Sequence, residues 1–222
     1  MACELRADFG AEVRTLAMDL AAEGAPQRAL AVIDEAVAKA GHCGGPKPTG
    51  LGLLVFNACA SRIGGFTDAA NDDVVVDLNC RALLRFAHAV APRLEARGGG
   101  SVSGGMLLLS SMAGFHGSAL QAAYSASKAF TTALGEALWA ELAPKGITVR
   151  VVAAGAVDTP NFQAVTPAAK RGKALPMHPD EVARAALASL RRPPGAAPVS
   201  VPGALNAFAE WLMRRLMTPR QA

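Results

Sequence analysis

The segment MLLLSSMAGFHGSALQAAYSASKAF, residues 106–130, joins a continuous apolar run, two serines and a Tyr-x-x-x-Lys pair. Met106 to Leu109 is apolar at every position, which is typical of a parallel strand that is buried on both faces. A helical pattern follows over 121–142 and ends before Pro144. The segment therefore predicts a buried strand that leads through a loop into a long helix.

The same alternation extends outward in both directions. A further apolar run at 51–56 and the largely apolar segment at 148–153 predict two more buried strands. Because strands and helices alternate, the sequence predicts an α/β fold with a parallel sheet and helices on both of its faces. The remaining expected elements are strands at 12–18 and 198–201, helices at 27–40, 72–96, 180–191 and 205–217, and a loop at 41–50.

Composition limits the classes of function. With 222 residues, of which 51% are hydrophobic, residues 1–222 suit a single domain. The net charge of +4 is small, and the sequence shows no concentrated basic face, so a nucleic-acid partner is not expected. No apolar run is long enough to span a membrane, and charges at positions 4, 6 and 8 argue against a signal peptide. Four scattered cysteines favour a reduced cytoplasmic protein, and no group of residues predicts a metal site.

Tyr124 and Lys128 carry the strongest chemical signal. Four positions apart on a helix, they lie on one face. A phenol with a pKa of about 10 is a poor acid–base catalyst at neutral pH, and a nearby cation lowers that pKa. Ser111 ends the strand at 106–109, on the side where open α/β sheets bind ligands, and its hydroxyl can hold a substrate oxygen. The alternative is an ordinary surface pair, but Tyr124 is the only tyrosine in the chain.

Several motifs resemble those of the short-chain dehydrogenase/reductase family. They are LVFNACA at 54–60, DLN at 77–79, LLLSSMAG at 107–114, YSASKAF at 124–130 and GITVR at 146–150. The resemblance covers nearly the whole chain. It implies a Rossmann-like, doubly wound parallel sheet and NAD- or NADP-dependent reduction of a carbonyl or oxidation of an alcohol. The wording of the motifs is similar to 3-oxoacyl and hydroxysteroid-type reductases.

The resemblance also assigns catalytic roles. It implies that Tyr124 is the general acid in reduction and that Ser111 positions the substrate carbonyl. Lys128 would lower the pKa of the tyrosine and hold the nicotinamide ribose, and Asn79 would hold a water that relays protons to Lys128. Ser110 is a competing serine, but the thirteen-residue spacing to Tyr124 favours Ser111.

Further contacts follow from the same resemblance. His116, on the loop that leads to Tyr124, would contact the substrate. A homodimer or homotetramer is expected, and no metal. The implied cofactor contacts, besides Tyr124 and Lys128, are Asp19 at the adenine, Asn57 and Ala58 after the strand at 51–56, and Gly155, Val157 and Thr159 near the nicotinamide.

The chain departs from the family pattern at its start. The family begins with a strand, a Gly-rich turn, a helix and a second strand, and none of these is present. The strand at 12–18 would therefore lose its neighbour, and the strand at 51–56 would expose an apolar edge. Three explanations stay open: an incomplete chain, a second chain that supplies the missing part, and a non-catalytic remnant that serves as a partner or regulatory subunit. Phe56, Cys59 and Ala154, which replace Asn, Gly and Pro of the family motifs, agree with the last.

Residues 204–222 predict an amphipathic C-terminal helix. Leu205, Phe208, Trp211, Leu212 and Leu216 lie near one stripe, and Arg214, Arg215 and Arg220 cluster at its end. Such a helix can lie on an anionic membrane surface. It can equally dock on the protein or on a partner subunit, and docking is the favoured interpretation.

Overall fold

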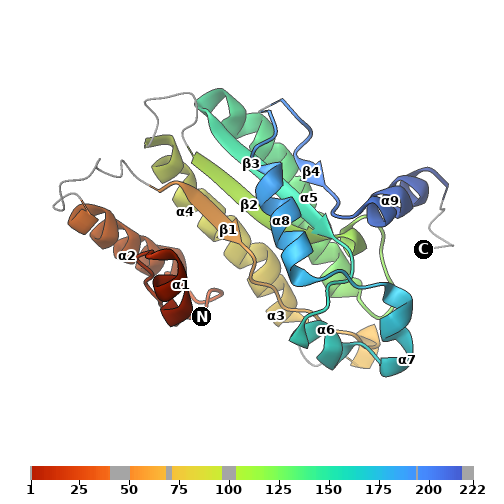
Figure 1. The fold of residues 1–222 in the computed structure, drawn as a ribbon. Helices are drawn as coiled ribbons and strands as arrows, with labels where there is room; N and C mark the ends of the chain where they lie inside the picture. The colour runs from red at the N-terminus through yellow and green to blue at the C-terminus, as the bar shows by residue number, and fades with distance from the viewer. Residues whose placement is uncertain (1, 41–50, 69–71, 97–103, 194, 217–222) are drawn as a thin grey trace.

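A computed structural model describes residues 2–40, 51–68, 72–96, 104–193 and 195–216 (Figure 1). Four parallel strands form one sheet in the order β1-β2-β3-β4. They are β1 (Leu53–Phe56), β2 (Gly104–Ser111), β3 (Ile147–Ala154) and β4 (Val199–Ser200). The predicted parallel α/β architecture is confirmed, and the buried strands predicted at 51–56, 106–109 and 148–153 correspond to β1, β2 and β3. The predicted loop at 41–50 lies outside the described residues.

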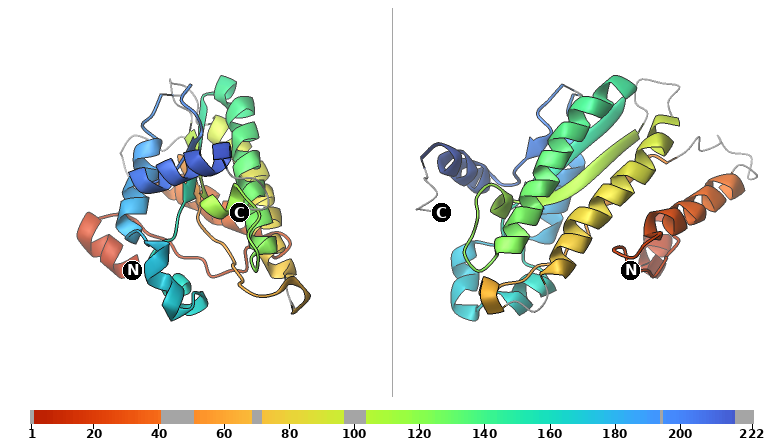
Figure 2. Two further views of the ribbon diagram at one scale, coloured as in Figure 1. Left: turned by 90° about the vertical axis from the view of Figure 1, so that its right-hand side faces the viewer. Right: turned by 180° about the vertical axis from the view of Figure 1, so that it is seen from behind.

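Helices cover both faces of the sheet. The rear view in Figure 2 shows α4 (Leu83–Ala96) and α5 (Ala122–Leu142) side by side over one face, with α2 (Ala25–Ala40) further out, beyond β1. The opposite face carries α8 (Pro179–Ser189), which is in front in Figure 1. The structure thus has three layers, as right-handed crossovers between parallel strands require.

Side chains of the two central strands divide between two apolar cores. Met106 and Leu108 of β2 pack with α4 and α5, whereas Leu107 points to the other face and packs with α8. This alternation follows from the two-residue period of a strand. Because both faces are covered, almost every position of β2 and β3 is buried, which explains why both sequences are largely apolar, although β3 also carries Arg150.

Shorter elements complete the described chain. The predicted helix at 72–96 is divided into α3 (Asp73–Val76), a π-helical turn (Asp77–Ala82) and α4. Residues 155–178 contain α6 (Pro160–Val165) and α7 (Ala168–Arg171). The chain begins with α1 (Ala2–Phe9) and its described part ends in α9 (Ala204–Leu216). No helix among the described residues is both long and apolar enough to cross a membrane.

The predicted strand at 12–18 is wrong. These residues form irregular chain, and most of their side chains are exposed. Arg6 of α1 donates a hydrogen bond to the carbonyl of Val13, and Arg14 pairs with Glu12 at 2.7 Å. A strand is stabilised by the ladder it makes with a neighbour, and this segment has none among the described residues.

Strand β1 forms one edge of the described sheet, as the sequence predicted. Val55 exposes 48% of its surface there. Helix α2 lies beyond this edge and is tied to α4, because Arg93 forms a two-point ion pair with Asp34 at 3.2 and 2.9 Å. An apolar cavity of about 220 Å³ separates α2 from β1, and it is lined by Ala29, Leu30, Ile33, Leu51, Leu53, Leu54, Val55, Phe86 and Val90.

Filling this cavity is expected to stabilise the chain. Ala29→Leu adds three carbons at the cavity wall, which should raise the free energy of unfolding by about 1–2 kcal/mol. The matched control is Ala31→Leu, an exposed position of the same helix, where no gain is expected. Denaturant unfolding measures both variants. Equal effects of the two substitutions would show that the cavity does not exist in solution.

Candidate active site

The carboxyl ends of the parallel strands meet along one edge of the sheet. Phe56, Ser111 and Ala154 end β1, β2 and β3 respectively. The loops that follow them therefore emerge side by side, at the edge where open α/β sheets bind ligands. Helix α5 begins beyond the loop that follows β2, which brings Tyr124 and Lys128 from its first turns to the same edge.

Tyr124, Lys128 and Ser111 form one cluster. The ammonium nitrogen of Lys128 lies 5.7 Å from the centroid of the Tyr124 ring. The Ser111 hydroxyl lies close enough to the Tyr124 phenol to act on its pKa, and it accepts a hydrogen bond of 3.2 Å from the amide of Ala113. Lys128 is only 4% exposed and donates a hydrogen bond of 2.9 Å to the carbonyl of Leu109. The three residues predicted as catalytic are thus brought together.

The structure separates the two competing serines. Ser110 points into α5, where its hydroxyl bonds the Lys128 carbonyl at 2.9 Å and the Thr132 hydroxyl at 2.8 Å. Ser111, the next residue of the strand, points the other way, toward Tyr124. The period of the strand requires these opposite directions. The choice of Ser111 from its spacing agrees with this geometry.

Asn79 lies in the π-helical turn and joins three segments. Its amide nitrogen donates to the Ala60 carbonyl at 2.8 Å and to the Ser127 hydroxyl at 2.9 Å. Its amide oxygen accepts from the Ala60 amide at 2.8 Å. Ser127 in turn donates to the Tyr124 carbonyl at 2.8 Å. The side chain predicted to hold a relay water thus directs these three hydrogen bonds to protein atoms, and it fixes the loop after β1 against α5.

The loop after Ser111 lies directly on α5. A Cβ atom at Gly114 would lie 2.6 Å from the carbonyl carbon of Lys128, so only glycine fits this contact. His116 follows in the same loop, and its Nε2 atom is buried without a hydrogen-bond partner. A buried nitrogen of this kind is costly unless a ligand or water completes it. This favours the substrate contact predicted for His116.

Burial controls the acid–base properties of the cluster. Burial raises the pKa of the Tyr124 phenol above its ordinary value; the hydrogen bond from Ser111 opposes this change, and the nearby Cys59 adds to it. Burial likewise lowers the pKa of Lys128. The sequence predicted the opposite direction for Tyr124. The difference arises because removing the phenol from water disfavours its charged form.

Three predicted cofactor residues come before the cluster in the chain. Asn57 is exposed directly after β1, and Ala58 packs against the core beside it. Asp19 is exposed in the turn before α2, where its carboxylate accepts a hydrogen bond of 2.9 Å from the Ala21 amide. Asn57 and Ala58 thus directly precede Cys59, which lies near Tyr124 and Lys128, whereas the hydrogen bond described for Asp19 is local to its own turn.

The other three predicted cofactor residues follow β3. A Cβ atom at Gly155 would lie 2.7 Å from the Asn206 amide nitrogen. Val157 forms an isolated parallel bridge with Met177. Thr159 caps α6, accepting a hydrogen bond of 3.2 Å from the Phe162 amide. All three lie in the segment after the carboxyl end of the third strand, as the motif predicted.

These residues fit one end of a nicotinamide dinucleotide. A ribose hydroxyl can bond the Lys128 ammonium and the Tyr124 phenol, and the segments after β1 and β3 can border the nicotinamide ring. The phosphates are different, because they are commonly bound at a helix N-terminus after a Gly-rich turn. The described residues contain no short Gly-rich turn that leads directly from a strand into a helix.

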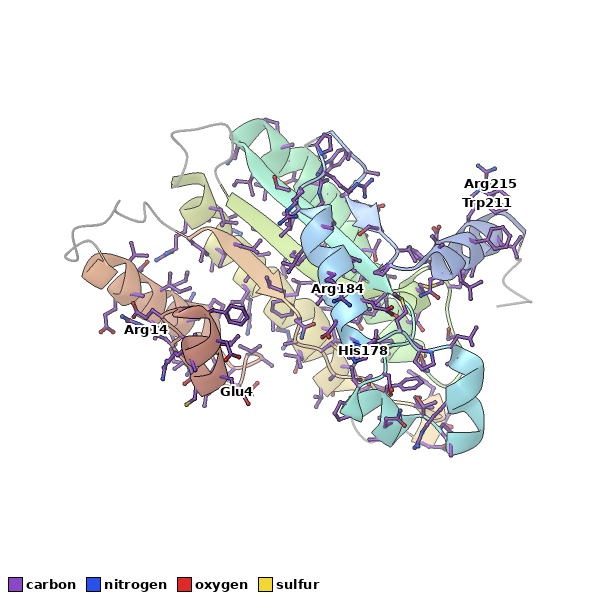
Figure 3. All side chains as sticks on the ribbon, in the orientation of Figure 1. Glu4, Arg14, His178, Arg184, Trp211 and Arg215 are labelled. Atoms are coloured by element: carbon purple, nitrogen blue, oxygen red, sulfur yellow. The ribbon has the colours of Figure 1, made fainter. Side chains whose placement is uncertain are left out.

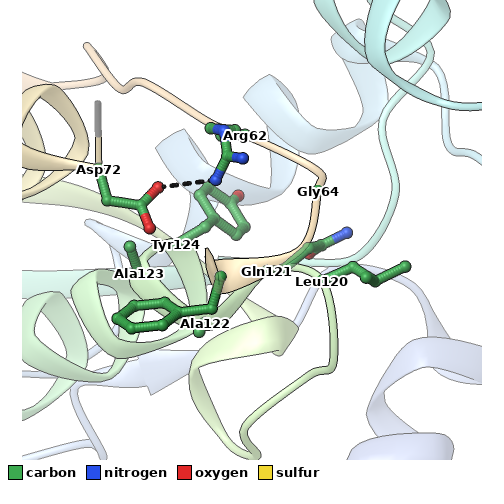
Figure 4. Close-up of a pocket in the computed structure, with 9 residues that line it drawn as sticks. Arg62, Gly64, Asp72, Leu120, Gln121, Ala122, Ala123 and Tyr124 are labelled. Carbon is green, nitrogen blue, oxygen red and sulfur yellow. Dashed lines mark hydrogen bonds and ion pairs between the residues drawn. The ribbon is translucent and has the colours of Figure 1, made fainter. Parts of the chain in front are cut away.

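A small hollow opens beside Tyr124, with a volume of about 20 Å³ (Figure 4). Arg62 borders it and pairs with Asp72 at 3.2 Å. The adjoining loop is tied to α6 by a hydrogen bond of 3.1 Å between Asn161 and Ser61. This space holds about one water, so a substrate requires these segments to separate. Sequence analysis missed Arg62 and Asp72, since no motif marks a pair that closes only in the folded chain.

Two cysteines complete the surroundings of Lys128. The charges of Cys59 and Cys80 act to raise the pKa of Lys128, so both thiols lie within electrostatic range of its ammonium. Cys59 is exposed and Cys80 partly buried, and burial raises the pKa of Cys80. Within the part of the chain that the structure describes, no group of three or more His, Cys, Asp or Glu residues could hold a metal.

Comparison with known proteins gives a consistent result. The sequence profile described as short chain dehydrogenase matches residues 1–170. Nodulation protein G of Azospirillum brasilense is 36% identical over 115 residues, which are 51% of this chain and 45% of that protein. Very-long-chain 3-oxoacyl-CoA reductase of Phaeosphaeria nodorum is 30% identical over 149 residues, 66% of this chain and 41% of that protein. The match thus spans less than half of either relative.

Solved structures show the same fold. A short-chain dehydrogenase from Sphingobium yanoikuyae, in complex with NADPH, superposes with a TM-score of 0.72 and 27% identity. The match covers 100% of this chain and 83% of that one. The similarity thus extends over the whole arrangement of sheet and helices that holds the Tyr124 cluster.

Proposed function

Because this chain belongs to the short-chain dehydrogenase/reductase family, we propose that it is an NAD(P)-dependent oxidoreductase that reduces a carbonyl or oxidises the corresponding alcohol. The observation that carries the proposal is the single cluster of Ser111, Tyr124 and Lys128. It provides one hydroxyl to hold an oxygen, one phenol to exchange a proton and one cation beside the phenol. These are the groups that carbonyl reduction requires of a protein.

The roles follow from the geometry. Ser111 donates a hydrogen bond to the substrate oxygen and holds it beside the Tyr124 phenol. A raised pKa keeps Tyr124 protonated at neutral pH, so it gives its proton to the oxygen as negative charge develops there. When bound, the dinucleotide supplies the hydride to the carbonyl carbon. The Lys128 cation steadies the phenolate that remains, and His116 borders the substrate.

Asn79 acts through position. Its hydrogen bonds to Ala60 and Ser127 fix the loop after β1 against the helix that carries Tyr124. The loop after β1, which would border the nicotinamide ring, and the Tyr124 proton donor thereby stay at a constant distance from each other. Such rigidity matters because a small displacement of reacting groups lowers the rate steeply.

We further propose a substrate of the 3-oxoacyl or hydroxysteroid type. Support comes from the similarity to a 3-oxoacyl-CoA reductase, together with the wording of the motifs around Tyr124. Cys3, Cys59 and Cys80 are free, which agrees with a reducing cytoplasmic location. A homodimer or homotetramer is the assembly we expect.

The direct test is a carbonyl-dependent assay. The full chain is mixed with NADPH or NADH and with a panel of 3-oxoacyl thioesters and ketosteroids, and absorbance follows oxidation of the nicotinamide. Consumption that depends on the added carbonyl compound is expected. If the chain binds no dinucleotide, the assay is repeated with any in-frame upstream coding sequence included. Tight dinucleotide binding without turnover of any carbonyl or alcohol would contradict the proposal.

The two serines offer a matched pair of variants. Ser111→Ala should lower kcat about 10²-fold, the loss seen for one hydrogen bond to a reacting oxygen, with little change in stability. Ser110→Ala should leave kcat unchanged but cost about 1–2 kcal/mol, since it removes buried hydrogen bonds to Lys128 and Thr132. Kinetics and denaturant unfolding are measured on both. A loss of kcat in Ser110→Ala alone would reverse the assignment.

One observation favours a second candidate, a non-catalytic partner or regulatory subunit. Cys59 places a side chain near Tyr124 and Lys128, where the family motif has glycine. A side chain at that position can crowd a cofactor. Cys59→Gly distinguishes the candidates, since a crowded site gains dinucleotide affinity in this variant and an intact site does not. Calorimetric titration with NADPH measures the difference.

A further inference from the structure

Helix α9 is attached to the protein by its polar side. Asn206 donates hydrogen bonds to the Pro202 carbonyl at 3.1 Å and to the Met177 sulfur at 3.2 Å. The same side chain packs against Gly155, directly after β3. Ala209 and Glu210, about one turn further on, are partly buried. The helix is thus docked on the chain, as the sequence favoured, but the apolar stripe does not make the contact.

The apolar side of α9 faces solvent instead. Leu205, Phe208, Trp211 and Leu212 are 62%, 58%, 46% and 36% exposed. The rings of Phe208 and Trp211 stack with centroids 6.0 Å apart, and Arg215 lies over the Trp211 ring at 5.2 Å. Figure 3 shows Trp211 and Arg215 on the side of α9 away from the body of the protein. A surface helix normally buries its apolar stripe, so this orientation is inverted.

We propose that α9 binds a lipid surface with this exposed apolar face, and that anionic lipid is preferred. A stripe of aromatic side chains with a cationic side chain at its end suits the boundary between acyl chains and headgroups. Arg215, exposed at the end of the stripe, can contact anionic headgroups while Trp211 and Phe208 enter the acyl region. The helix lies in the membrane plane, which needs no spanning length.

A second copy of this chain fits the stripe less well. A stable protein interface buries about 800 Å² on each partner. A large aromatic side chain buries about 150–250 Å² when it is covered fully. Phe208 and Trp211 are already about half covered, and Leu205 and Leu212, which are 62% and 36% exposed, do not bring the four described side chains to this area. The exposed stripe alone is therefore too small for a stable dimer interface, whereas insertion into a bilayer requires no minimum contact area.

The attachment of α9 places the proposed membrane contact close to the candidate active site. Asn206 packs on Gly155, which follows the carboxyl end of β3. A membrane on the outer side of α9 therefore lies near the edge of the sheet that carries Tyr124. An apolar substrate dissolved in the bilayer would have a short path to the site. The binding itself does not depend on catalysis, so it is tested without any substrate.

The test uses tryptophan fluorescence and vesicle sedimentation with the full chain. Trp139→Phe leaves Trp211 as the sole tryptophan. Vesicles of phosphatidylcholine alone, and of phosphatidylcholine mixed with phosphatidylserine, are titrated into this protein. We expect co-sedimentation and a blue shift of the Trp211 emission, both stronger with phosphatidylserine. Arg215→Gln should reduce the preference for the anionic vesicles about fivefold.

Matched variants decide whether the stripe is responsible. Phe208→Ser combined with Leu212→Ser should lower vesicle binding about tenfold or more. The control is Leu187→Ser, which removes a side chain of similar exposure from α8. Equal binding of the stripe variant and the control would overturn the proposal. So would a dimer in sedimentation velocity that the stripe variant alone abolishes, because the stripe would then be an interface between two copies.

Discussion

Tyr124→Phe is expected to lower kcat/KM for carbonyl reduction by about 10²–10⁴-fold while dinucleotide affinity stays nearly constant. The substitution removes only the phenolic oxygen, and the ring keeps its contact with Lys128. Without the phenol, no other acidic proton of the described cluster is held beside Ser111. Steady-state kinetics and fluorescence titration with NADPH, on the form of the protein that binds the dinucleotide, measure both quantities. Unchanged turnover would remove Tyr124 from the mechanism.

The pH dependence tests the same assignment. Because burial raises the pKa of Tyr124 above its usual value of 10.0, the phenol stays protonated through the neutral range. Reduction needs the protonated form, so its rate should be level across neutral pH and fall only in strongly alkaline solution. Alcohol oxidation needs the phenolate and should rise with pH over the same range. In any residual activity of Tyr124→Phe, both the alkaline fall in the rate of reduction and the rise in the rate of oxidation should vanish. If either pH dependence persists, another group acts as the acid.

Arg150→Leu is expected to reduce the free energy of unfolding by about 3–5 kcal/mol, because it removes several hydrogen bonds from a charged donor, each of which contributes about 1.5–3 kcal/mol. Arg150 is completely buried in β3. Its guanidinium donates to the carbonyls of Ser189, Arg192, Pro193 and Ala196 at 2.8–3.0 Å. Ser189 ends α8 and the other three residues follow it, in the region where carbonyls have no partners within the helix. Leucine removes the donor that these carbonyls share.

Two controls accompany this variant. Arg191→Leu removes an arginine that is exposed just after α8, and its effect should be within about 0.5 kcal/mol. Arg150→Lys keeps the charge but loses the planar fork, so its cost should lie between the other two. Urea unfolding, followed by circular dichroism, measures all three. A cost for Arg150→Leu no larger than that of Arg191→Leu would show that this contact contributes little.

The elements predicted most accurately are those whose own residues determine the structure that they form. The segments at 106–109 and 148–153 are largely apolar because helices cover both faces of β2 and β3, and the apolar run at 51–56 contains β1. The segment at 12–18 failed because a strand also needs a neighbour, which local sequence does not reveal. The C-terminal helix formed as predicted, but the side that touches the protein depends on Met177 and Pro202, which are not in the helix.

The site divides in the same way. Spacing predicted that Ser111, Tyr124 and Lys128 meet, because strand and helix periods carry that information. It did not predict the π-helical turn, whose Asn79 bonds Ala60, 19 positions away. The direction of the Tyr124 pKa was wrong, since the sequence shows the cation but not the burial that outweighs it. The Arg62–Asp72 pair was missed for a related reason, since it forms only in the tertiary structure.

The hydrogen bonds of Asn79 also bear on the order of folding. They link residues 60, 79 and 127, and the contact from 79 to 127 spans 48 positions. Contacts between distant positions close loops of high entropy, and they form after local helix contacts. The amide of Ala60, held by the Asn79 side chain, should therefore exchange its hydrogen with solvent only through large-scale opening. In that case, the catalytic geometry would be among the last features acquired on folding and would be lost only when the fold opens on a large scale.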